Sequence, residues 1–267
     1  MTHMKIELVK MRRTLLLNNR FGDYVPRFVF RLTNTPRFGF RARNILYALK
    51  YLHSNMQRDR VHFSDVAEFG VAQGEGFRQL VILTLSFCAL RGIPAPAFHA
   101  FDTFQGMPET KDPSDIGTWS KGDYPGDEVQ LRTLLDENGV GSSCHLHKGL
   151  FSETLPKLGR DFSPSFLLVD CDYYTSTKDI FENLKDSLAS GSVVYFDDLG
   201  TNFFNKNMGE ERFIHELNAG LFGEQYYLHN IFDKLYVWSN SKKPIVKSRA
   251  DVLHIHLKDD FVLGDFY

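Results

Sequence analysis

Four aspartates, each close after an apolar run of strand length, are the residues of this sequence best placed to do chemistry. Asp170 and Asp172 follow the run 166–169, and Asp197 and Asp198 follow the run 193–196. Uninterrupted apolar runs are typical of buried parallel strands, and ligands of open α/β sheets bind beyond the carboxyl ends of such strands. Carboxylates that share one crevice repel each other, so the pattern predicts a cationic ligand, first of all a divalent cation bound through oxygen.

A glycine-rich turn after an earlier strand-like run predicts a second binding element. Residues 66–71 lead through Gly70, Gly74 and Gly76 into a helical pattern. Glycines let a ligand approach the backbone closely, and they direct the N-terminus of the following helix toward that ligand. The spacing differs from the dinucleotide fingerprint G-x-G-x-x-G. Glu68, just before the turn, suits the ammonium group of an amino acid better than a pyrophosphate.

The next strand-like run, residues 97–101, ends at Asp102. In nucleoside-binding folds an acid at this place accepts hydrogen bonds from ribose hydroxyls, although a strand-terminal Asp is also a common turn former. The segment 103–126 that follows is rich in Gly, Pro, Asp and Ser, and a loop of this length is usually functional or mobile. We interpret it as a lid with Trp119 as an apolar wall, or as a loop that Trp119 anchors.

The elements that position these residues belong to a chain long enough for one large α/β domain. It has 267 residues, 43% of them hydrophobic, and its net charge of −2 gives no hint of a polyanionic partner. The three cysteines form no C-x-x-C pair, so we expect neither a disulfide framework nor a zinc site, and a reducing cytoplasm fits best. We find no signal peptide and no apolar run long enough to cross a membrane, so no membrane partner is expected.

Residues 1–60 form a basic, aromatic-rich arm with thirteen Lys and Arg against three Asp and Glu. A basic arm can bind nucleic acid or an anionic surface. The interleaved aromatic residues favour packing instead, so we expect a helical cap and a subunit contact of a homo-oligomer, and no nucleic-acid partner. Apolar residues at helical spacing predict a helix over 41–56 that lies against the sheet.

The remaining pattern predicts an α/β fold with a seven-stranded, mostly parallel sheet. Helices are expected near 129–135, 175–189 and 210–220, and the runs 225–231 and 234–238 read as a C-terminal antiparallel hairpin linked at Phe232 and Asp233. His145 and His147 alternate along a short strand; with no third ligand nearby, we interpret them as ordinary histidines. Residues 241–267 form an extension with one more strand-like run at 252–257.

Five ordered motifs over residues 41–240 resemble the macrocin O-methyltransferase family of class I S-adenosylmethionine-dependent methyltransferases, which have a Rossmann-like fold. Residues 68–74 resemble its cofactor turn, 101–109 its F-D-[ST]-F-x-G-[LM]-P-E, 148–156 its K-G-x-F-x-x-T-L-P, 170–177 its D-x-D-x-Y-x-S-T and 196–198 its F-D-D. The resemblance implies that residues 61–240 are the methyltransferase domain, with the arm 1–60 and the extension 241–267 outside it.

The family's chemistry implies an enzyme that needs Mg²⁺ and methylates a hydroxyl of a sugar or glycosylated small molecule, as in antibiotic biosynthesis. By position, Mg²⁺ would be held by Asp170, Asp197 and Asp198, and Asp172 would be the general base. S-adenosylmethionine would be held at its methionine end by Glu68, Gly70, Val71 and Gly74, and at its ribose by Asp102, with Thr103 beside it.

Several alternatives stay open. Asp172 could instead cap the helix that begins near Thr175. Leu199-Gly200 stands where many family members have Tyr-Gly, and residues 205–209 lack their usual G-A-x-x-A helix start. Both departures concern the acceptor, so another hydroxylated acceptor such as a polysaccharide sugar is possible. A nicotinamide-dependent oxidoreductase conflicts with the glycine spacing, and a non-catalytic binding module would have no use for four retained carboxylates.

Overall fold

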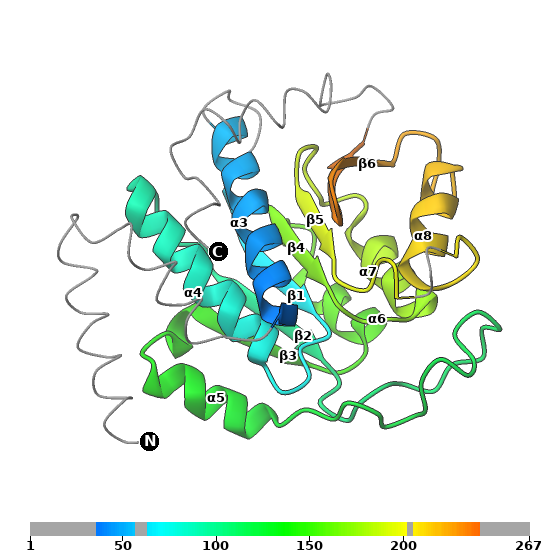
Figure 1. Cartoon of the computed structure of the whole chain (residues 1–267), viewed down its shortest axis with the longest axis horizontal. Coiled ribbons are helices and arrows are strands. Elements are labelled where there is room, and N and C mark those ends of the chain that lie inside the picture. Colours follow the sequence, from blue (N-terminus) through cyan, green and yellow to red (C-terminus); the bar gives the residue numbers. More distant parts are fainter. Residues whose placement is uncertain (1–35, 57–62, 202–204, 241–267) are drawn as a thin grey trace.

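A seven-stranded sheet forms the centre of the computed structural model, which describes residues 36–56, 63–201 and 205–240 (Figure 1). The strand order is β3-β2-β1-β4-β5-β7-β6. The strands are β1 (Val66–Phe69), β2 (Phe98–Asp102), β3 (Cys144–Lys148), β4 (Phe166–Val169), β5 (Val193–Phe196), β6 (Tyr227–Phe232) and β7 (Leu235–Ser239). Strands β1 to β5 run parallel to one another, and β7 pairs antiparallel with β5 and β6. The predicted α/β class and the C-terminal hairpin are confirmed.

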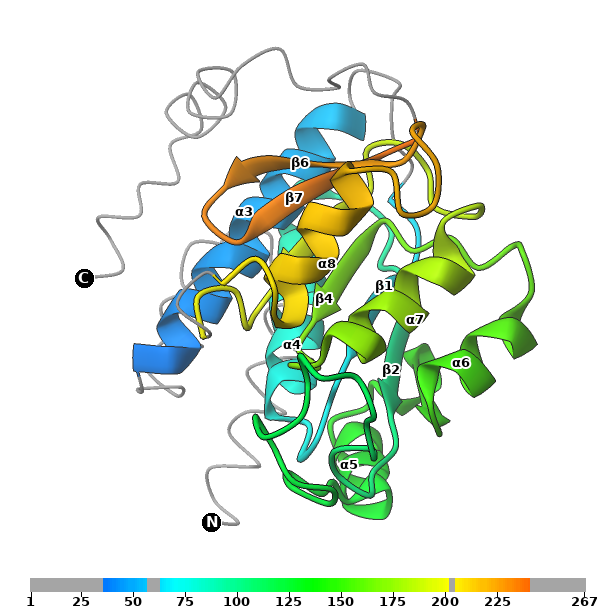
Figure 2. The same ribbon diagram turned by 90° about the vertical axis from the view of Figure 1, so that its right-hand side faces the viewer.

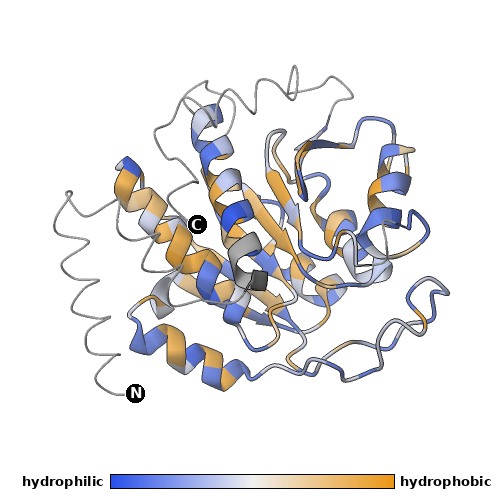
Figure 3. Cartoon of the chain, viewed as in Figure 1, coloured by the Kyte–Doolittle hydropathy of each residue, from blue (hydrophilic) through white to orange (hydrophobic). Residues whose placement is uncertain are grey.

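Helices cover both faces of the sheet (Figure 2). One layer holds α3 (Pro36–Met56), α4 (Glu75–Arg91) and α5 (Glu128–Glu137), and the other holds α6 (Phe151–Thr154), α7 (Tyr174–Leu184) and α8 (Gly209–Asn218). Each layer has its own hydrophobic core against the sheet. The central strands are mostly apolar because they are buried on both faces, and they are largely orange in Figure 3.

The predicted helix of the N-terminal cap is present and begins at Pro36, five residues earlier than its apolar spacing indicated. Proline is compatible with a first helical turn because the missing N–H would have no intrahelical partner there. Ile45, Leu49 and Leu52 are completely buried in the core shared with α4 and the sheet. This part of the cap is therefore integral to the domain, whereas residues 1–35 lie outside the described part of the chain.

Three details differ from the predictions or fall beyond the structure. Helix α7 ends at Leu184 instead of residue 189, because the chain turns at 185–187 and still buries Leu188. The hairpin turn consists of Asp233 and Lys234 instead of Phe232 and Asp233, and Asp233 takes the positive φ of 45° that the tight turn requires. The strand-like run 252–257 lies outside the described residues. In the described ranges, no helix has the length and apolar character to cross a membrane.

Candidate active site at the carboxyl edge of the sheet

A cavity of about 1300 Å³ opens at the carboxyl ends of the parallel strands. Eight of the ten residues predicted for the site line it: Gly70, Val71, Asp102, Thr103, Asp170, Asp172, Asp197 and Asp198. Glu68 and Gly74 do not line it; Glu68 lies within β1, and Gly74 is the N-cap of α4. The single-crevice prediction is therefore confirmed for the four aspartates.

Asp170, Asp197 and Asp198 each contribute one carboxylate oxygen to a group whose members lie within 4.8 Å of one another. Backbone hydrogen bonds that continue the sheet ladder hold them there: the Asp170 N–H donates to Phe69 O at 2.9 Å and the Asp197 N–H to Val169 O at 2.8 Å. Three convergent carboxylate oxygens are a donor set that suits a hard divalent cation such as Mg²⁺. The chemistry of these residues thus fits the ion implied by the family resemblance.

A buried arginine from α3, absent from the sequence-based site, reaches into the same group. Arg41 Nη2 pairs with Asp170 Oδ2 at 2.5 Å and with Asp197 Oδ2, and Arg41 Nε donates to Asp197 Oδ1 at 3.2 Å. Tyr195 also donates its hydroxyl to Asp197, and Lys234 donates to the Asp197 carbonyl. Burial alone would raise the pKa of Asp197, but the charge of Arg41 and these hydrogen bonds outweigh it and lower that pKa.

Asp198 lies in a more strongly acidic environment. Burial raises its pKa well above the usual value, and the nearby Asp170 and Asp172 charges raise it further. Its backbone N–H donates at 3.2 Å to Glu210, a completely buried acid in the first turn of α8 whose pKa burial also raises. Glu210 is a second residue that the sequence reasoning missed, although an acid at a helix start is a recognisable signal.

Asp172 adopts φ of 58°, a left-handed conformation that non-glycine residues rarely take. Its N–H donates to Asp198 Oδ2 at 3.1 Å, which joins the two aspartates. The alternative role, capping α7, is filled by Asp115, whose carboxylate accepts hydrogen bonds from the N–H groups of Tyr174 and Thr175. Strained backbone at the mouth of a cavity is a common property of functional positions.

The glycine turn lies directly against the strand that carries Asp170. Gly70 has φ of 89°, and a Cβ there would lie 1.8 Å from the Asp170 carbonyl oxygen, so the position requires glycine. Asp102 Oδ2 accepts from the N–H groups of Val71 and Ala72 at 2.7 and 2.8 Å. Asp102 is therefore bound to the turn and borders the cavity, so it combines the turn-forming role with the position expected for a ribose contact.

The remaining predicted cofactor residues are Gly74, Thr103 and Glu68. Gly74 is the N-cap of α4 with φ of 79°. Thr103 donates its hydroxyl to the Gly106 carbonyl at 2.8 Å and shapes the start of the loop. Glu68 is completely buried in β1, and among the described residues its two carboxylate oxygens have no hydrogen-bond partner. Burial raises the pKa of Glu68 well above its usual value, against the lowering effect of Arg41.

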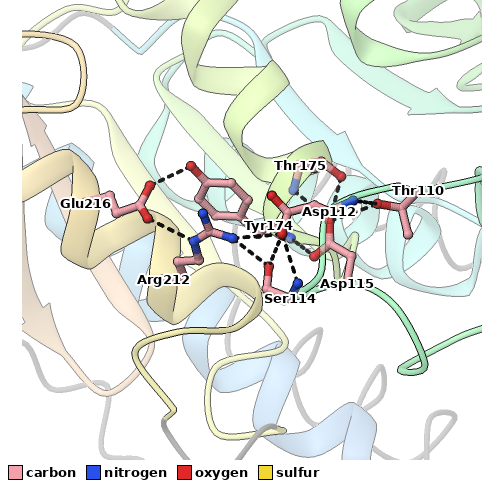
Figure 4. A network of polar contacts seen from close by, with 8 residues as sticks. All are labelled: Thr110, Asp112, Ser114, Asp115, Tyr174, Thr175, Arg212 and Glu216. Atoms are coloured by element: carbon pink, nitrogen blue, oxygen red, sulfur yellow. Dashed lines mark hydrogen bonds and ion pairs between the residues drawn. The ribbon is translucent and has the colours of Figure 1, made fainter.

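The long loop 103–126 is anchored by a polar network to α7 and α8 (Figure 4). Arg212 lies over the Tyr174 ring, 3.8 Å from its centroid, and pairs with Asp112 at 2.8 Å and Glu216 at 2.9 Å. The Tyr173 hydroxyl donates to the Trp119 carbonyl at 3.1 Å. Trp119 borders the cavity, so it both anchors the loop and forms part of the wall.

The two histidines of β3 have a third neighbour, contrary to the sequence interpretation. His99 on β2 contacts both of them. Its Nδ1 lies 3.0 Å from His147 Nε2, and its ring centroid lies 4.9 Å from that of His145. Parallel pairing of β2 and β3 brings them together, with His99 opposite His145. We call these three residues the histidine stack. Among the residues that the structure describes, these three histidines do not form a group whose ligand atoms are arranged to hold a metal ion.

Comparison with known proteins places this geometry in context. The model of the macrocin-O-methyltransferase (TylF) family matches residues 33–222. The solved structure of the O-methyltransferase NovP has 21% sequence identity and a TM-score of 0.55, covering 76% of this chain and 80% of NovP. CalS11, a calicheamicin methyltransferase, has 22% identity and a TM-score of 0.53, covering 88% and 91%. These two likenesses concern the fold; no curated protein matches the sequence significantly.

Proposed function

Because this chain belongs to the macrocin-O-methyltransferase family and is an S-adenosylmethionine-dependent O-methyltransferase, we propose that its acceptor is a hydroxyl of a sugar or glycosylated small molecule. We propose further that the transfer depends on Mg²⁺. The observation that carries the proposal is one cavity bordered by the glycine turn, three convergent carboxylates and Asp172. NovP and CalS11, an O-methyltransferase and a calicheamicin methyltransferase, support an acceptor of the natural-product type.

The glycine turn and its neighbours are the proposed cofactor site. Gly70 and Val71 present backbone to the cavity, and Gly74 starts α4, whose N-terminus faces the turn. Asp102 and Thr103 border the side proposed for the ribose. The buried Glu68 side chain, whose carboxylate oxygens lack a hydrogen-bond partner among the described residues, is the proposed contact of the methionine ammonium. When bound, S-adenosylmethionine supplies a methyl group on a cationic sulfur.

Asp170, Asp197 and Asp198 are the proposed Mg²⁺ ligands, and Asp172 is the proposed general base. A bound Mg²⁺ would make an acceptor hydroxyl easier to deprotonate. Asp172 then accepts the hydroxyl proton while the oxygen forms its bond to the methyl carbon and the sulfur takes the electron pair of the broken bond. Asp115 accepts the hydrogen bonds of the α7 N-terminus, so the helix does not need Asp172 as its cap. This supports the base role of Asp172.

Residues on the acceptor side decide which hydroxyl binds. Trp119 and Tyr124 pack edge to face with ring centroids 5.0 Å apart, and both border the cavity. Apolar ring faces next to carboxylates suit the mixed apolar and hydroxyl surface of a sugar. Leu199, which stands where many family members have Tyr, is buried, and the Gly200 N–H donates to Glu211 of α8. We propose that this segment shapes the part of the acceptor site next to α8. A polysaccharide sugar is the second candidate acceptor.

Two properties of the whole molecule complete the proposal. The three cysteines are free and buried, which supports a cytoplasmic location. The basic arm of residues 1–60 is proposed as a subunit contact of a homo-oligomer, which size-exclusion chromatography of the full chain and of a chain without residues 1–35 would test.

Calorimetry and a transfer assay test the function. We expect S-adenosylhomocysteine to bind the full chain, and labelled methyl groups to pass from S-adenosylmethionine to members of a panel of sugar nucleotides and glycosides when Mg²⁺ is present. Absence of S-adenosylhomocysteine binding would contradict the proposed cofactor site. Transfer at an unchanged rate in excess chelator would contradict the Mg²⁺ dependence and leave the rest intact.

A further inference from the structure

Arg41 occupies the position that a cation bound to the carboxylate group would need. Its guanidinium bridges Asp170 and Asp197, two of the three proposed Mg²⁺ ligands, from a side chain that is only 7% exposed. The bridge involves Oδ2 of both aspartates, and Nε engages the second oxygen of Asp197. Two of the three carboxylates therefore already have a counterion within the protein.

The protein is built to accommodate this arginine. A Cβ at Gly76 would lie 2.1 Å from Arg41 Nη1 and 2.6 Å from Glu68 Oε1, so a glycine in the first turn of α4 leaves room for both groups. Both atoms thus lie next to Gly76. Burial alone would lower the pKa of Arg41, but Asp170 and Asp197 raise it, so the guanidinium keeps its charge. Glu68 is therefore a buried acidic neighbour of Arg41 in addition to the two aspartates.

A divalent cation and the Arg41 guanidinium compete for the carboxylate oxygens of Asp170 and Asp197. Each carboxylate has a limited set of lone pairs, and two cations that share them repel each other. A dication entering the group therefore has to push Arg41 away from Asp170 and Asp197, and it binds against the energy of the ion pairs it replaces.

We propose that Arg41 is a resident counterion of the carboxylate group and that a divalent cation binds by displacing its guanidinium. The inference rests on the proposed Mg²⁺ site and deepens it. Arg41 is a positioning residue that keeps Asp170 and Asp197 in place in the metal-free enzyme and weakens metal affinity. Arg41 Nη1 and Glu68 Oε1 both lie beside Gly76, so the displaced guanidinium has a buried acidic side chain as its neighbour.

The test is calorimetric titration of MgCl₂ into the metal-free full chain and into its Arg41→Met and Arg41→Lys variants. Methionine keeps the length of the side chain without its charge, so we expect Mg²⁺ to bind at least tenfold more tightly than to the unaltered protein. Lysine keeps the charge but lacks the fork that bridges two carboxylates, so we expect an intermediate affinity. Arg43→Met is the matched control, because Arg43 pairs with Asp233 outside the group and its loss changes the net charge equally.

Thermal melts with chelator and with Mg²⁺ give the second readout. Arg41→Met leaves buried carboxylates without their counterion, so its midpoint should fall in chelator and rise on Mg²⁺ addition by more than that of the unaltered protein. The inference is overturned if the Mg²⁺ affinity of both Arg41 variants is unchanged or weaker than that of the unaltered protein. It is also overturned if Arg43→Met tightens Mg²⁺ binding equally, or if no chain binds Mg²⁺. Calorimetry with S-adenosylhomocysteine on the same samples reports separately on the proposed function.

Discussion

The carboxylate group and the histidine stack lie on one sheet and solve the same problem in opposite ways. Both gather titratable side chains in a place that is at least partly buried. At the carboxyl edge, Arg41 pairs with Asp170 and Asp197, and its charge lowers the pKa of Asp197, which stays ionised. In the histidine stack, burial and the neighbouring rings lower the pKa of His99 to about 3 and that of His147 to about 4, so both are neutral at pH 7.

The difference in charge compensation between the two regions indicates which of them is expected to bind a ligand. A buried charge persists only where an opposite charge compensates it, and a buried group without one gives up its charge. The carboxylate group retains an excess of acids over Arg41, and it borders a cavity. His99 and His147 have lost their charge and pack against Phe101 and Phe162, with ring centroids 4.3 Å from His147 to Phe101 and 4.7 Å from His99 to Phe162. The first region is suited to bind a cation, and the second is a polar part of the core.

The largest expected effect is the loss of activity on metal removal. In excess EDTA, methyl transfer should fall to background and return with added Mg²⁺, because the carboxylates alone cannot polarise the acceptor hydroxyl. The melting midpoint should change little, because Arg41 compensates the carboxylates in the metal-free protein. Parallel assays and melts check this; a large drop in midpoint with intact activity would reverse the roles assigned to metal and arginine.

Asp172→Asn should lower the rate of methyl transfer by about 10²–10⁴-fold, the usual contribution of a general base. The amide keeps the shape of the side chain but cannot accept the proton. Binding of S-adenosylhomocysteine should stay within about twofold, and the melting midpoint should remain close to that of the unaltered chain, because Asp172 does not cap α7. Unchanged transfer would assign the base role elsewhere.

Much of this comparison was predictable from local patterns. The apolar runs that end at Asp170 and Asp197 indicated both the strands and the crevice, because burial on both faces leaves a clear signature in sequence. The C-terminal antiparallel hairpin was predicted from runs of the same kind, whereas the order of the strands in the sheet was not predicted. Departures were confined to element ends, such as α7, where turns and helix continuation compete over a few residues.

The contacts that define the site chemistry were less accessible, because they join residues far apart in the chain. Arg41 pairs with Asp197 across 156 residues, and Asp115 caps a helix 59 residues later. One signal for Arg41 existed: it lies four residues before Ile45 and eight before Leu49, on the buried face of α3, where a charge needs a partner. His99 joined the histidine stack through strand pairing, which spacing within β3 could not reveal.

Asp115→Ala should destabilise the protein by about 2–3 kcal/mol, because it leaves the N–H groups of Tyr174 and Thr175 and the Thr175 hydroxyl without their acceptor. Asp127→Ala is the matched control. It removes the exposed N-cap of α5, which accepts from Gln130 N–H at 2.9 Å, and should cost about 1 kcal/mol. Urea denaturation measures both. Equal effects would mean that Asp115 adds nothing beyond an ordinary cap.

The histidine stack should make the fold acid-sensitive by about 2 kcal/mol. His99 has a lowered pKa, so its contribution is complete above about pH 6.5, the value in the unfolded chain, and is lost as pH falls toward its folded value of about 3. At pH 5 this single group costs about 2 kcal/mol relative to pH 7.5. Urea denaturation at both pH values should show a smaller loss for His99→Gln. His215→Gln, on the exposed side of α8, should keep the full loss; an identical loss in all three chains would contradict the assignment.

The most direct test of the contrast between the two regions is a crystal structure with S-adenosylhomocysteine and Mn²⁺, whose anomalous signal locates the ion. The account predicts a peak among Asp170, Asp197 and Asp198 with the Arg41 guanidinium moved off them, the cofactor product at the turn 70–76, and no peak at the histidine stack. Bound S-adenosylhomocysteine without an ion at the aspartates, or an ion at the histidines, would contradict it.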